Sequence, residues 1–173
     1  MAKTLLEQLP DITKKQAEQQ VVSKQRVTDH GEVYTNVREV NAMLDLVEQE
    51  TARIESRFLE PACGTGNFLV EVLNRKLAVV AERYARSQLE YERYAVIAIS
   101  SIYGIDILLD NVVACQTRLF DIFNQQYTTL FKKETKEQCR HTVKFILSRN
   151  ILHGDALTLK TVIAPIKPII FSE

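Results

Sequence analysis

The spacing of apolar residues along the chain changes between a helical period and short apolar runs. From residue 36 to about residue 54, apolar positions recur every three or four residues with charged residues between them, which predicts an amphipathic helix. The same pattern predicts helices over residues 68–76 (with an interrupted continuation to 101), 109–123 and 139–148. A polar connection is expected at residues 127–137.

Short apolar runs between the helical segments predict buried strands. The predicted strands are Arg57–Leu59, Ile102–Ile107 and Asn150–His153, with a fourth expected to begin over Lys167–Phe171. Strands that are separated by helices need crossover connections, which indicates a parallel sheet. The predicted fold class is therefore α/β, with a doubly wound, mostly parallel sheet whose first three strands contain Leu59, Ile105 and Leu152.

The chain divides into a polar N-terminal segment and one folded domain. Residues 1–30 are rich in charge with sparse apolar positions, and predict a helical or partly ordered arm. Residues 31–173 carry the predicted strands and helices. A chain of 173 residues has room for one α/β domain with a substantial core and hardly for two.

Composition and charge exclude some classes of function. Lys plus Arg and Asp plus Glu both total 22, so the chain lacks the overall basic charge of many nucleic-acid-binding proteins, although one face can still be basic. The three cysteines are widely spaced, which fits reduced thiols rather than a disulfide framework. The histidines fall into no metal-ligand spacing with them, so no metal site is expected. No segment has the length of a membrane span or the core of a signal sequence, so we expect a cytoplasmic location and no membrane partner.

One segment carries more chemical information than the rest of the chain. Residues 58–69 read Phe-Leu-Glu-Pro-Ala-Cys-Gly-Thr-Gly-Asn-Phe-Leu, a short apolar entry followed by a two-glycine loop and a helix start. Gly64 and Gly66 can adopt positive φ and carry no Cβ, so a nucleotide-like ligand can lie against the turn. A dinucleotide-binding loop has a third glycine where this chain has Leu69. Glu60 would also repel a phosphate, whereas it suits a cationic or hydroxyl-bearing ligand.

An acidic residue stands at the end of each of the three predicted strands: Glu60, Asp106 and Asp155. Ligands of doubly wound sheets bind outside the carboxyl ends of the strands. We therefore expect Asp106 to accept hydrogen bonds from ribose hydroxyls and Asp155 to accept one from an adenine amino group. Each acid alone equally fits a strand end that caps the next helix. Three acids in register with one glycine loop favour a ligand site.

The glycine loop closely resembles motif I of S-adenosylmethionine-dependent methyltransferases, in the form found in DNA adenine-N6 methyltransferases of restriction–modification systems. Tyr-Gly-Ile-Asp at 103–106 is similar to the second-strand motif of these enzymes, and His-Gly-Asp-Ala-Leu at 153–157 to the third. The resemblance implies a Rossmann-like fold, S-adenosyl-L-methionine as the cofactor and DNA as the partner of the full-length enzyme. The cofactor-binding residues that it implies are Tyr34, Thr35, Glu60, Pro61, Ala62, Gly64, Gly66, Asn67, Asp106, Ile107, Asp155 and Ala156.

The segment from Asp29 to Leu44 resembles the motif that precedes motif I in this class, Gly-x-aromatic-Thr-Pro followed by a helix. Tyr34 and Thr35 would then lie beside the methionine end of the cofactor, while Thr35 is also a suitable helix N-cap. Asn36 stands where the family usually has proline. A cofactor segment ahead of motif I, with target recognition expected later, is the arrangement called gamma.

The resemblance, from about Arg26 to Glu173, does not include the catalytic loop. In the family, an Asn-Pro-Pro-Tyr-like loop holds the exocyclic amino group of a flipped base. No two of the four prolines are adjacent, so neither that loop nor an Asp-Pro-Pro variant is present. We therefore expect a truncated, N-terminal cofactor-binding part without catalytic residues or a target-recognition domain. It should be inactive alone and prone to self-association through an exposed sheet edge or face.

Two other interpretations remain open at this stage. Amino methyltransferases that act on RNA or protein share this type of motif I, although the Glu-Pro-Ala-Cys form and the upstream Tyr-Thr pair favour DNA. Alternatively, a non-catalytic Rossmann-like module associates through residues 1–30 and the insertion at 77–101. The arginines and tyrosines of that insertion could stack on nucleic acid, but a solvated helix face with core tyrosines explains the same composition.

Overall fold

The computed structural model describes residues 35–171. The chain separates into two units, residues 1–36 and residues 37–173. The predicted arm at 1–30 and the candidate residue Tyr34 lie outside the described part. In the first unit, only Thr35 and Asn36 are described, and neither belongs to a helix or strand. The elements below all belong to the second unit.

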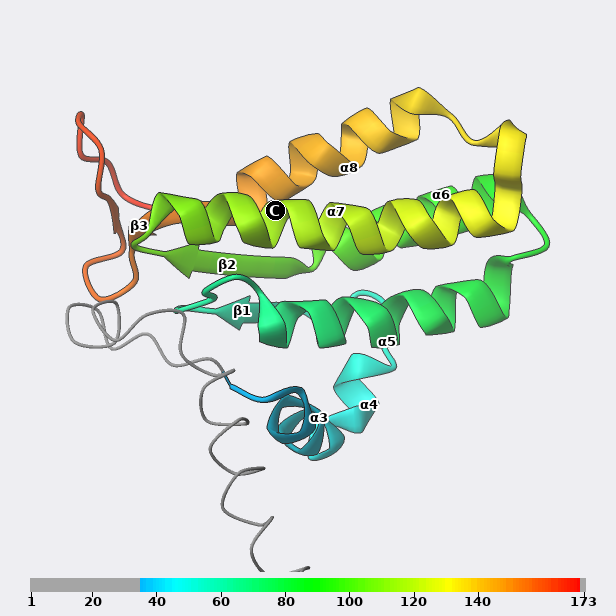
Figure 1. Ribbon diagram of the computed structural model, residues 1–173, viewed down its shortest axis with the longest axis horizontal. Helices are drawn as coiled ribbons and strands as arrows, with labels where there is room; N and C mark the ends of the chain where they lie inside the picture. Colours follow the sequence, from blue (N-terminus) through cyan, green and yellow to red (C-terminus); the bar gives the residue numbers. More distant parts are fainter. Residues whose placement is uncertain (1–34, 172–173) are drawn as a thin grey trace, which may run out of the picture. The chain divides into compact units, whose positions relative to one another are not determined.

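Three neighbouring parallel strands form the centre of the second unit, in the order β1-β2-β3 (Figure 1). They are β1 (Phe58–Glu60), β2 (Ile102–Asp106) and β3 (Ile151–Asp155). Leu59 is paired with Tyr103, and Ile105 with Leu152. The three predicted parallel strands are therefore confirmed, with ends shifted by one or two residues. Within the described residues the fold is mixed α/β with a mostly parallel sheet, whereas double winding stays a prediction.

Helices connect the strands and pack on one another. Their bounds are α3 Val37–Asp45, α4 Glu48–Thr51, α5 Asn67–Tyr84, α6 Gln88–Ser100, α7 Leu109–Phe131, the 3-10 helix η1 Lys132–Glu134 and α8 Glu137–Asn150. Helix α5 contacts β1, and α7 contacts β2 (Figure 1). The break predicted after residue 76 lies between α5 and α6, where the Ser87 hydroxyl caps α6 by accepting from the Glu90 N–H at 3.4 Å.

The polar connection predicted at residues 127–137 is wrong for its first half, because α7 continues to Phe131. Tyr127 is fully buried, and its ring stacks on Phe123 at 5.3 Å and contacts Phe131 at 5.7 Å. These aromatic residues recur every fourth position, so they extend the buried face of the helix through a segment whose other residues, apart from Leu130, are polar.

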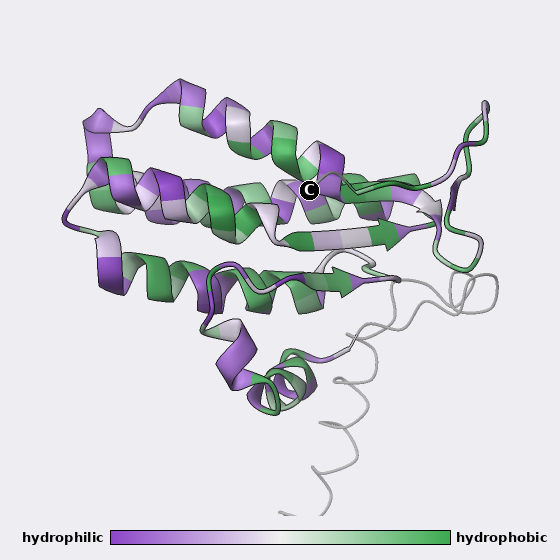
Figure 2. Ribbon diagram, turned by 180° about the vertical axis from the view of Figure 1, so that it is seen from behind, coloured by the Kyte–Doolittle hydropathy of each residue, from purple (hydrophilic) through white to green (hydrophobic). Residues whose placement is uncertain are grey.

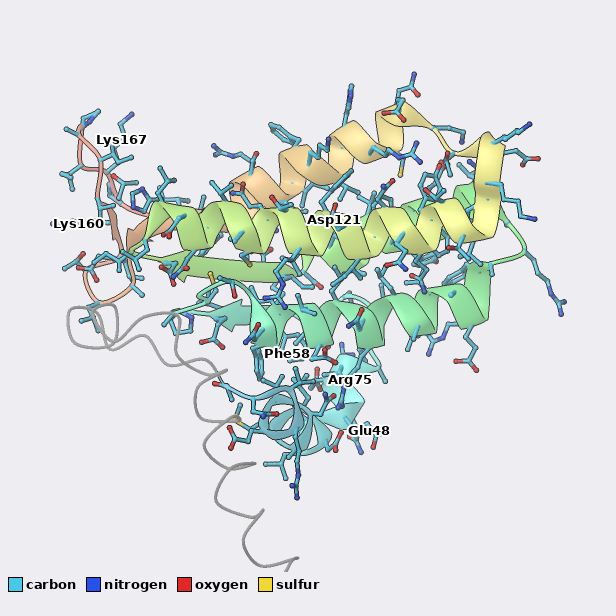
Figure 3. The ribbon with its side chains drawn as sticks, viewed as in Figure 1. Glu48, Phe58, Arg75, Asp121, Lys160 and Lys167 are labelled. Carbon is cyan, nitrogen blue, oxygen red and sulfur yellow. The ribbon has the colours of Figure 1, made fainter. Side chains whose placement is uncertain are left out.

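The fourth strand is not where the sequence predicted it. Strand β4 is Lys160–Thr161 and runs antiparallel to β3, whereas the segment expected to begin a strand at Lys167 contributes an isolated bridge from Pro168 to Lys160. Pro168 has no N–H to donate to a ladder, which limits pairing there. Lys160 and Lys167 mark this segment in Figure 3.

The core lies between the strands and the helices that connect them. Phe58, Ile102 and Ile151 face this core, whereas Leu59 points the other way and is 53% exposed. On that second face, Phe171 contacts the Tyr103 ring edge-on at 4.9 Å. Helix α8 mixes hydrophilic and hydrophobic turns in Figure 2, in agreement with its partial burial.

The tyrosines of the 77–101 insertion pack against other aromatic rings of the fold. Tyr91 is fully buried and contacts the rings of Tyr127 and Phe131. Tyr84 and Tyr94 stack on each other at 4.0 Å between ring centroids. These contacts support the interpretation of the insertion as core and solvated helix face rather than a stacking surface for nucleic acid.

A fully buried lysine joins the segments that lead into β1 and β2. The Lys76 ammonium donates to the carbonyls of Arg53, Ile54 and Ser56 at 3.1, 2.8 and 2.6 Å, and to the Ser101 hydroxyl at 2.8 Å. Burial lowers the pKa of Lys76 to about 8. The lysine therefore joins α5 to the segment before β1 and to the end of α6.

Helix α3 is held against α5 by a second basic residue. The Arg75 guanidinium donates to the Asp45 carboxylate at 2.6 Å and to the Asn41 side chain at 2.9 Å. Arg75 is labelled in Figure 3. The predicted single helix over 36–54 is in fact two helices, since the chain turns at Leu46 and Val47 between α3 and α4. In the described part of the chain, no helix is long and apolar enough to cross a membrane.

Candidate cofactor site

The loop between β1 and α5 has the backbone geometry that its glycines predict. Gly64 and Gly66 have φ of 52° and 88°, in the left-handed region. Gly66 forms the N-cap of α5 without a side-chain cap. A Cβ on Gly66 would lie 2.6 Å from Cys115 Sγ, so both the backbone angle and the space require glycine here.

Asp106 joins this loop to the end of β2. The Gly64 N–H donates to Asp106 Oδ2 at 2.8 Å. Oδ1 accepts from the Leu108 N–H at 2.8 Å and from the Asn111 side-chain amide at 3.2 Å. Asp106 as a residue is only 9% exposed, so its carboxylate organises the glycine loop and the start of α7 from a nearly buried position.

Asp106 retains capacity for a ligand. A carboxylate offers about four lone-pair sites, two on each oxygen. The donors of the described chain occupy both sites on Oδ1 and one on Oδ2. One lone-pair site on Oδ2 is left to accept a hydrogen bond. Asp106 can therefore accept from one ribose hydroxyl, whereas the sequence predicted that it accepts from both.

Glu60 lies at the end of β1, opposite Gly104 of β2. Its side chain is partly buried, and burial raises the pKa of Glu60 against the opposing hydrogen bond from the Ala62 N–H. The Cys63 N–H donates to the Ile105 carbonyl at 3.0 Å, which holds the loop beside β2. Pro61 and Ala62 are exposed, so this side of the loop is open to solvent.

Asp155 ends β3 in a different environment. Its carboxylate accepts from the Leu157 N–H at 2.8 Å and from the Thr158 hydroxyl at 3.0 Å, both within three residues along the chain. These two hydrogen bonds lower the pKa of Asp155. The neighbouring Ala156 is partly buried in the same turn. These local hydrogen bonds hold the Asp155 carboxylate in its own turn, and neither of them involves the glycine loop.

His153 links the ends of β2 and β3. It is paired with Asp106 in the sheet, and its Nε2 lies 3.0 Å from the Ile107 carbonyl oxygen. Because a carbonyl oxygen can only accept, this hydrogen bond requires a proton on Nε2. Among the described residues, Nδ1 of His153 is buried without a hydrogen-bond partner. The side chain of Ile107 is 53% exposed beside it.

The structure therefore brings several of the predicted residues together, while it does not place Tyr34 and Thr35 relative to them. Gly64, Gly66 and Asp106 meet at the carboxyl edge of the sheet, where Glu60 and Asp155 also end their strands. Thr35 belongs to the first unit and Tyr34 is outside the described residues. Their predicted place beside the cofactor stays a prediction.

Three residues on α7 contact the loop or its acid and were not predicted from the sequence: Asn111, Cys115 and Arg118. Their spacing places all three on one face of the helix. The hydrophobic pattern of the sequence identifies only Cys115 as a member of that face, because the other two residues are polar. The neighbouring Cys115 thiol and burial together raise the pKa of Cys63. Both thiols are buried and reduced, which fits packing beneath the loop. In the described segment, no cluster of side chains could hold a metal ion.

A family model for the MmeI DNA-methyltransferase domain matches residues 33–165, well over half of the 173-residue chain. The match includes the glycine loop and all three strand-end acids. Comparison with curated proteins and with solved structures found no match. The family match agrees with the motifs of the sequence. The chain belongs to the MmeI DNA-methyltransferase domain family of restriction–modification DNA methyltransferases.

Proposed function

We propose that the carboxyl edge of the sheet binds S-adenosyl-L-methionine for the methylation of an adenine amino group in DNA. The observation that carries the proposal is the hydrogen bond from the Gly64 N–H to Asp106 at 2.8 Å. It unites a glycine loop and a strand-end acid that are 42 residues apart in the sequence. This pairing at the edge of a parallel sheet is where nucleotide-like ligands bind.

The free lone pair of Asp106 Oδ2 can accept one ribose hydroxyl. Its position is fixed in advance, because Leu108, Asn111 and Gly64 already hold the carboxylate. Preorganisation of this kind lowers the entropic cost of binding. Gly64 and Gly66, without Cβ atoms, allow the ligand to approach the loop backbone.

Glu60 suits the positively charged end of the cofactor. Its raised pKa reflects the cost of burying a carboxylate without a cation, and a bound cation would offset that cost. The cofactor supplies a methyl group on a sulfonium, which is already reactive toward a nitrogen nucleophile. The residues of this site therefore only need to bind and orient it.

The adenine end would lie between β2 and β3. The exposed Ile107 side chain offers an apolar surface for the base, and Asp155 and Ala156 lie in the turn that follows the next strand. Asp155 would accept from the adenine amino group with a carboxylate that the Leu157 N–H already orients.

Methyl transfer requires more than this site. The sequence contains no Asn-Pro-Pro-Tyr-like loop, so none of its residues is assigned to holding the target amino group. We expect the 173-residue chain to bind the cofactor and to leave mixed-sequence DNA unlabelled when it is incubated with methyl-labelled S-adenosylmethionine. Labelled adenine would contradict this division between binding and transfer.

The proposal is tested by titrating the chain with S-adenosylhomocysteine, the demethylated product, in a calorimeter. Binding by the wild type and a loss of about ten- to a hundred-fold in Asp106→Ala are expected, because a charge-assisted hydrogen bond is removed. Asp121→Ala, on the exposed side of α7 (Figure 3), is the matched control and should bind as the wild type does. Equal affinity of wild type and Asp106→Ala would exclude Asp106 from the site.

A further inference from the structure

One face of α7 contacts the glycine loop at three successive positions. Asn111 holds Asp106, Cys115 packs beneath Gly66, and Arg118 reaches the loop residues on either side of Gly66. Positions separated by four and three residues lie on one face of a helix. The helix that follows β2 therefore supports the loop that follows β1.

Of these three residues, Arg118 makes the most hydrogen bonds to the glycine loop. Its Nη1 donates to the Thr65 carbonyl at 2.8 Å, to the Thr65 hydroxyl at 3.1 Å and to the Asn67 side-chain oxygen at 2.8 Å. The two loop residues lie 53 and 51 positions away along the chain. Arg118 is partly buried, so these hydrogen bonds are less exposed to competition from water than those of a surface arginine.

We propose that Arg118 is a positioning residue that latches the glycine loop in its ligand-binding conformation. Gly66 has a left-handed backbone, which glycine adopts readily but does not prefer over other conformations. A loop with two such glycines needs external bonds to remain in one conformation. Arg118 bonds Thr65 and Asn67, the residues that flank Gly66, and so limits the freedom of the turn on both sides.

This inference rests on the proposed function, since the latch matters only if the loop binds the cofactor. Arg118 is not expected to touch the cofactor itself, because the contacts of its Nη1 are with the loop. Loss of the latch should therefore first loosen the loop and, as a consequence, weaken binding. The two effects can be measured separately.

The first measurement is amide hydrogen exchange at Gly64 and Gly66 in the ligand-free 173-residue chain. Arg118→Met should accelerate exchange at both amides by about tenfold, as expected for the loss of a charge-assisted hydrogen bond. Arg118→Lys, which keeps a cationic donor, should restore most of the protection. The second measurement is the affinity for S-adenosylhomocysteine, which should fall by about tenfold in Arg118→Met and recover in Arg118→Lys.

Arg140→Met is the matched control. Arg140 also bonds several chain groups, including Asn124 at 2.6 Å and Glu137 at 2.7 Å, but it joins α8 to the far end of α7. Its loss should lower stability without changing loop exchange or affinity. If Arg118→Met does not fold, Arg118→Gln takes its place, and exchange at Gly64 and Gly66 is still expected to be faster than in Arg118→Lys because the cationic donor is lost.

The outcomes separate the latch from the function of the site. Unchanged loop exchange in Arg118→Met, or in Arg118→Gln where that variant replaces it, would overturn the latch, whatever the affinity. Loosened exchange with unchanged affinity would overturn its role in positioning the cofactor site. Failure of the wild type to bind S-adenosylhomocysteine would instead contradict the proposed function, while exchange would still decide whether Arg118 holds the loop.

Discussion

Asp106 and Asp155 end neighbouring parallel strands, yet their surroundings differ. Asp106 is nearly buried and accepts from Gly64, which lies 42 residues earlier, as well as from Leu108 and Asn111. Asp155 lies near the surface, and within the described residues its carboxylate accepts from Leu157 and Thr158 in the next turn. The first carboxylate assembles a site from distant segments, whereas the second stabilises a local turn.

The difference shows what a strand-end acid needs in order to indicate a ligand site. Local hydrogen bonds such as those of Asp155 form wherever an acid begins a turn, and require no ligand. A buried carboxylate with long-range partners needs a reason for its burial, because desolvation opposes the charge. We therefore infer that Asp106 contributes most to binding and that Asp155 is secondary.

The largest expected effect is that of Asp106→Ala. It leaves the N–H groups of Gly64 and Leu108 and the amide of Asn111 without their acceptor, so we expect a loss of about 3 kcal/mol in the free energy of unfolding. Denaturant titration measures this loss beside the fall in affinity proposed above. Asp155→Ala should change the unfolding free energy little, and a comparable loss there would remove the contrast between the two acids.

Lys76→Met should give the next largest loss of stability. It tests whether long-range hydrogen bonds of a buried charged residue are enough to indicate a ligand site. Lys76 is fully buried with four acceptors, but it lies at the amino-terminal ends of the strands. The variant should lose about 2 kcal/mol of stability, because unpaired carbonyls are partly offset by removal of a buried charge. Affinity for S-adenosylhomocysteine should be unchanged. A large loss of affinity in Lys76→Met would show that a buried charged residue affects cofactor binding wherever it lies, and not only at the carboxyl edge of the sheet.

The pH dependence of this variant has a definite sign. Burial lowers the pKa of Lys76 to about 8, so between about 8 and the ordinary lysine value near 10 the unfolded chain binds more protons than the folded chain. The contribution of Lys76 to stability therefore rises with pH over this window. The stability difference between wild type and Lys76→Met should grow as pH rises from about 8 to about 10, and a shrinking difference would contradict the lowered pKa.

The sequence predicts the parts of the site that depend on local backbone and alternation. Gly64 and Gly66 are recognisable because only glycine suits their φ, and Asp106 because it ends a buried apolar run. Asn111 and Arg118 are not recognisable, because polar residues on a helix read as solvent-exposed until the three-dimensional position of the loop is known. For the same reason the sequence pattern predicts a polar connection at Tyr127, whereas tertiary packing continues the helix.

Asn111→Ala should have a smaller effect than Asp106→Ala. It removes one of the three donors to Asp106 and leaves the other two in place. A hydrogen bond from a neutral donor to a carboxylate contributes about 1.5 kcal/mol, at the lower end of the range for charged acceptors, and its loss corresponds to roughly tenfold in affinity when the carboxylate becomes free to rotate. Calorimetry with S-adenosylhomocysteine measures this change. An affinity equal to that of the wild type would show that Gly64 and Leu108 alone fix the carboxylate.

The smallest expected effect is the change in stability that Asp155 causes as the pH is lowered. The Leu157 N–H and the Thr158 hydroxyl lower the pKa of Asp155, so the folded state favours the charged form more than the unfolded chain does. A lowered pKa of an acid stabilises the fold above the unfolded value of about 3.9, and this contribution is lost as pH falls through the folded value. Asp155→Asn should therefore be slightly less stable than the wild type at neutral pH, and the difference should vanish below the folded pKa. Because the group lies at the surface, salt should reduce the difference further. A difference that persists in strong acid would mean that Asp155 acts through contacts other than its charge, and would bring it closer in character to Asp106.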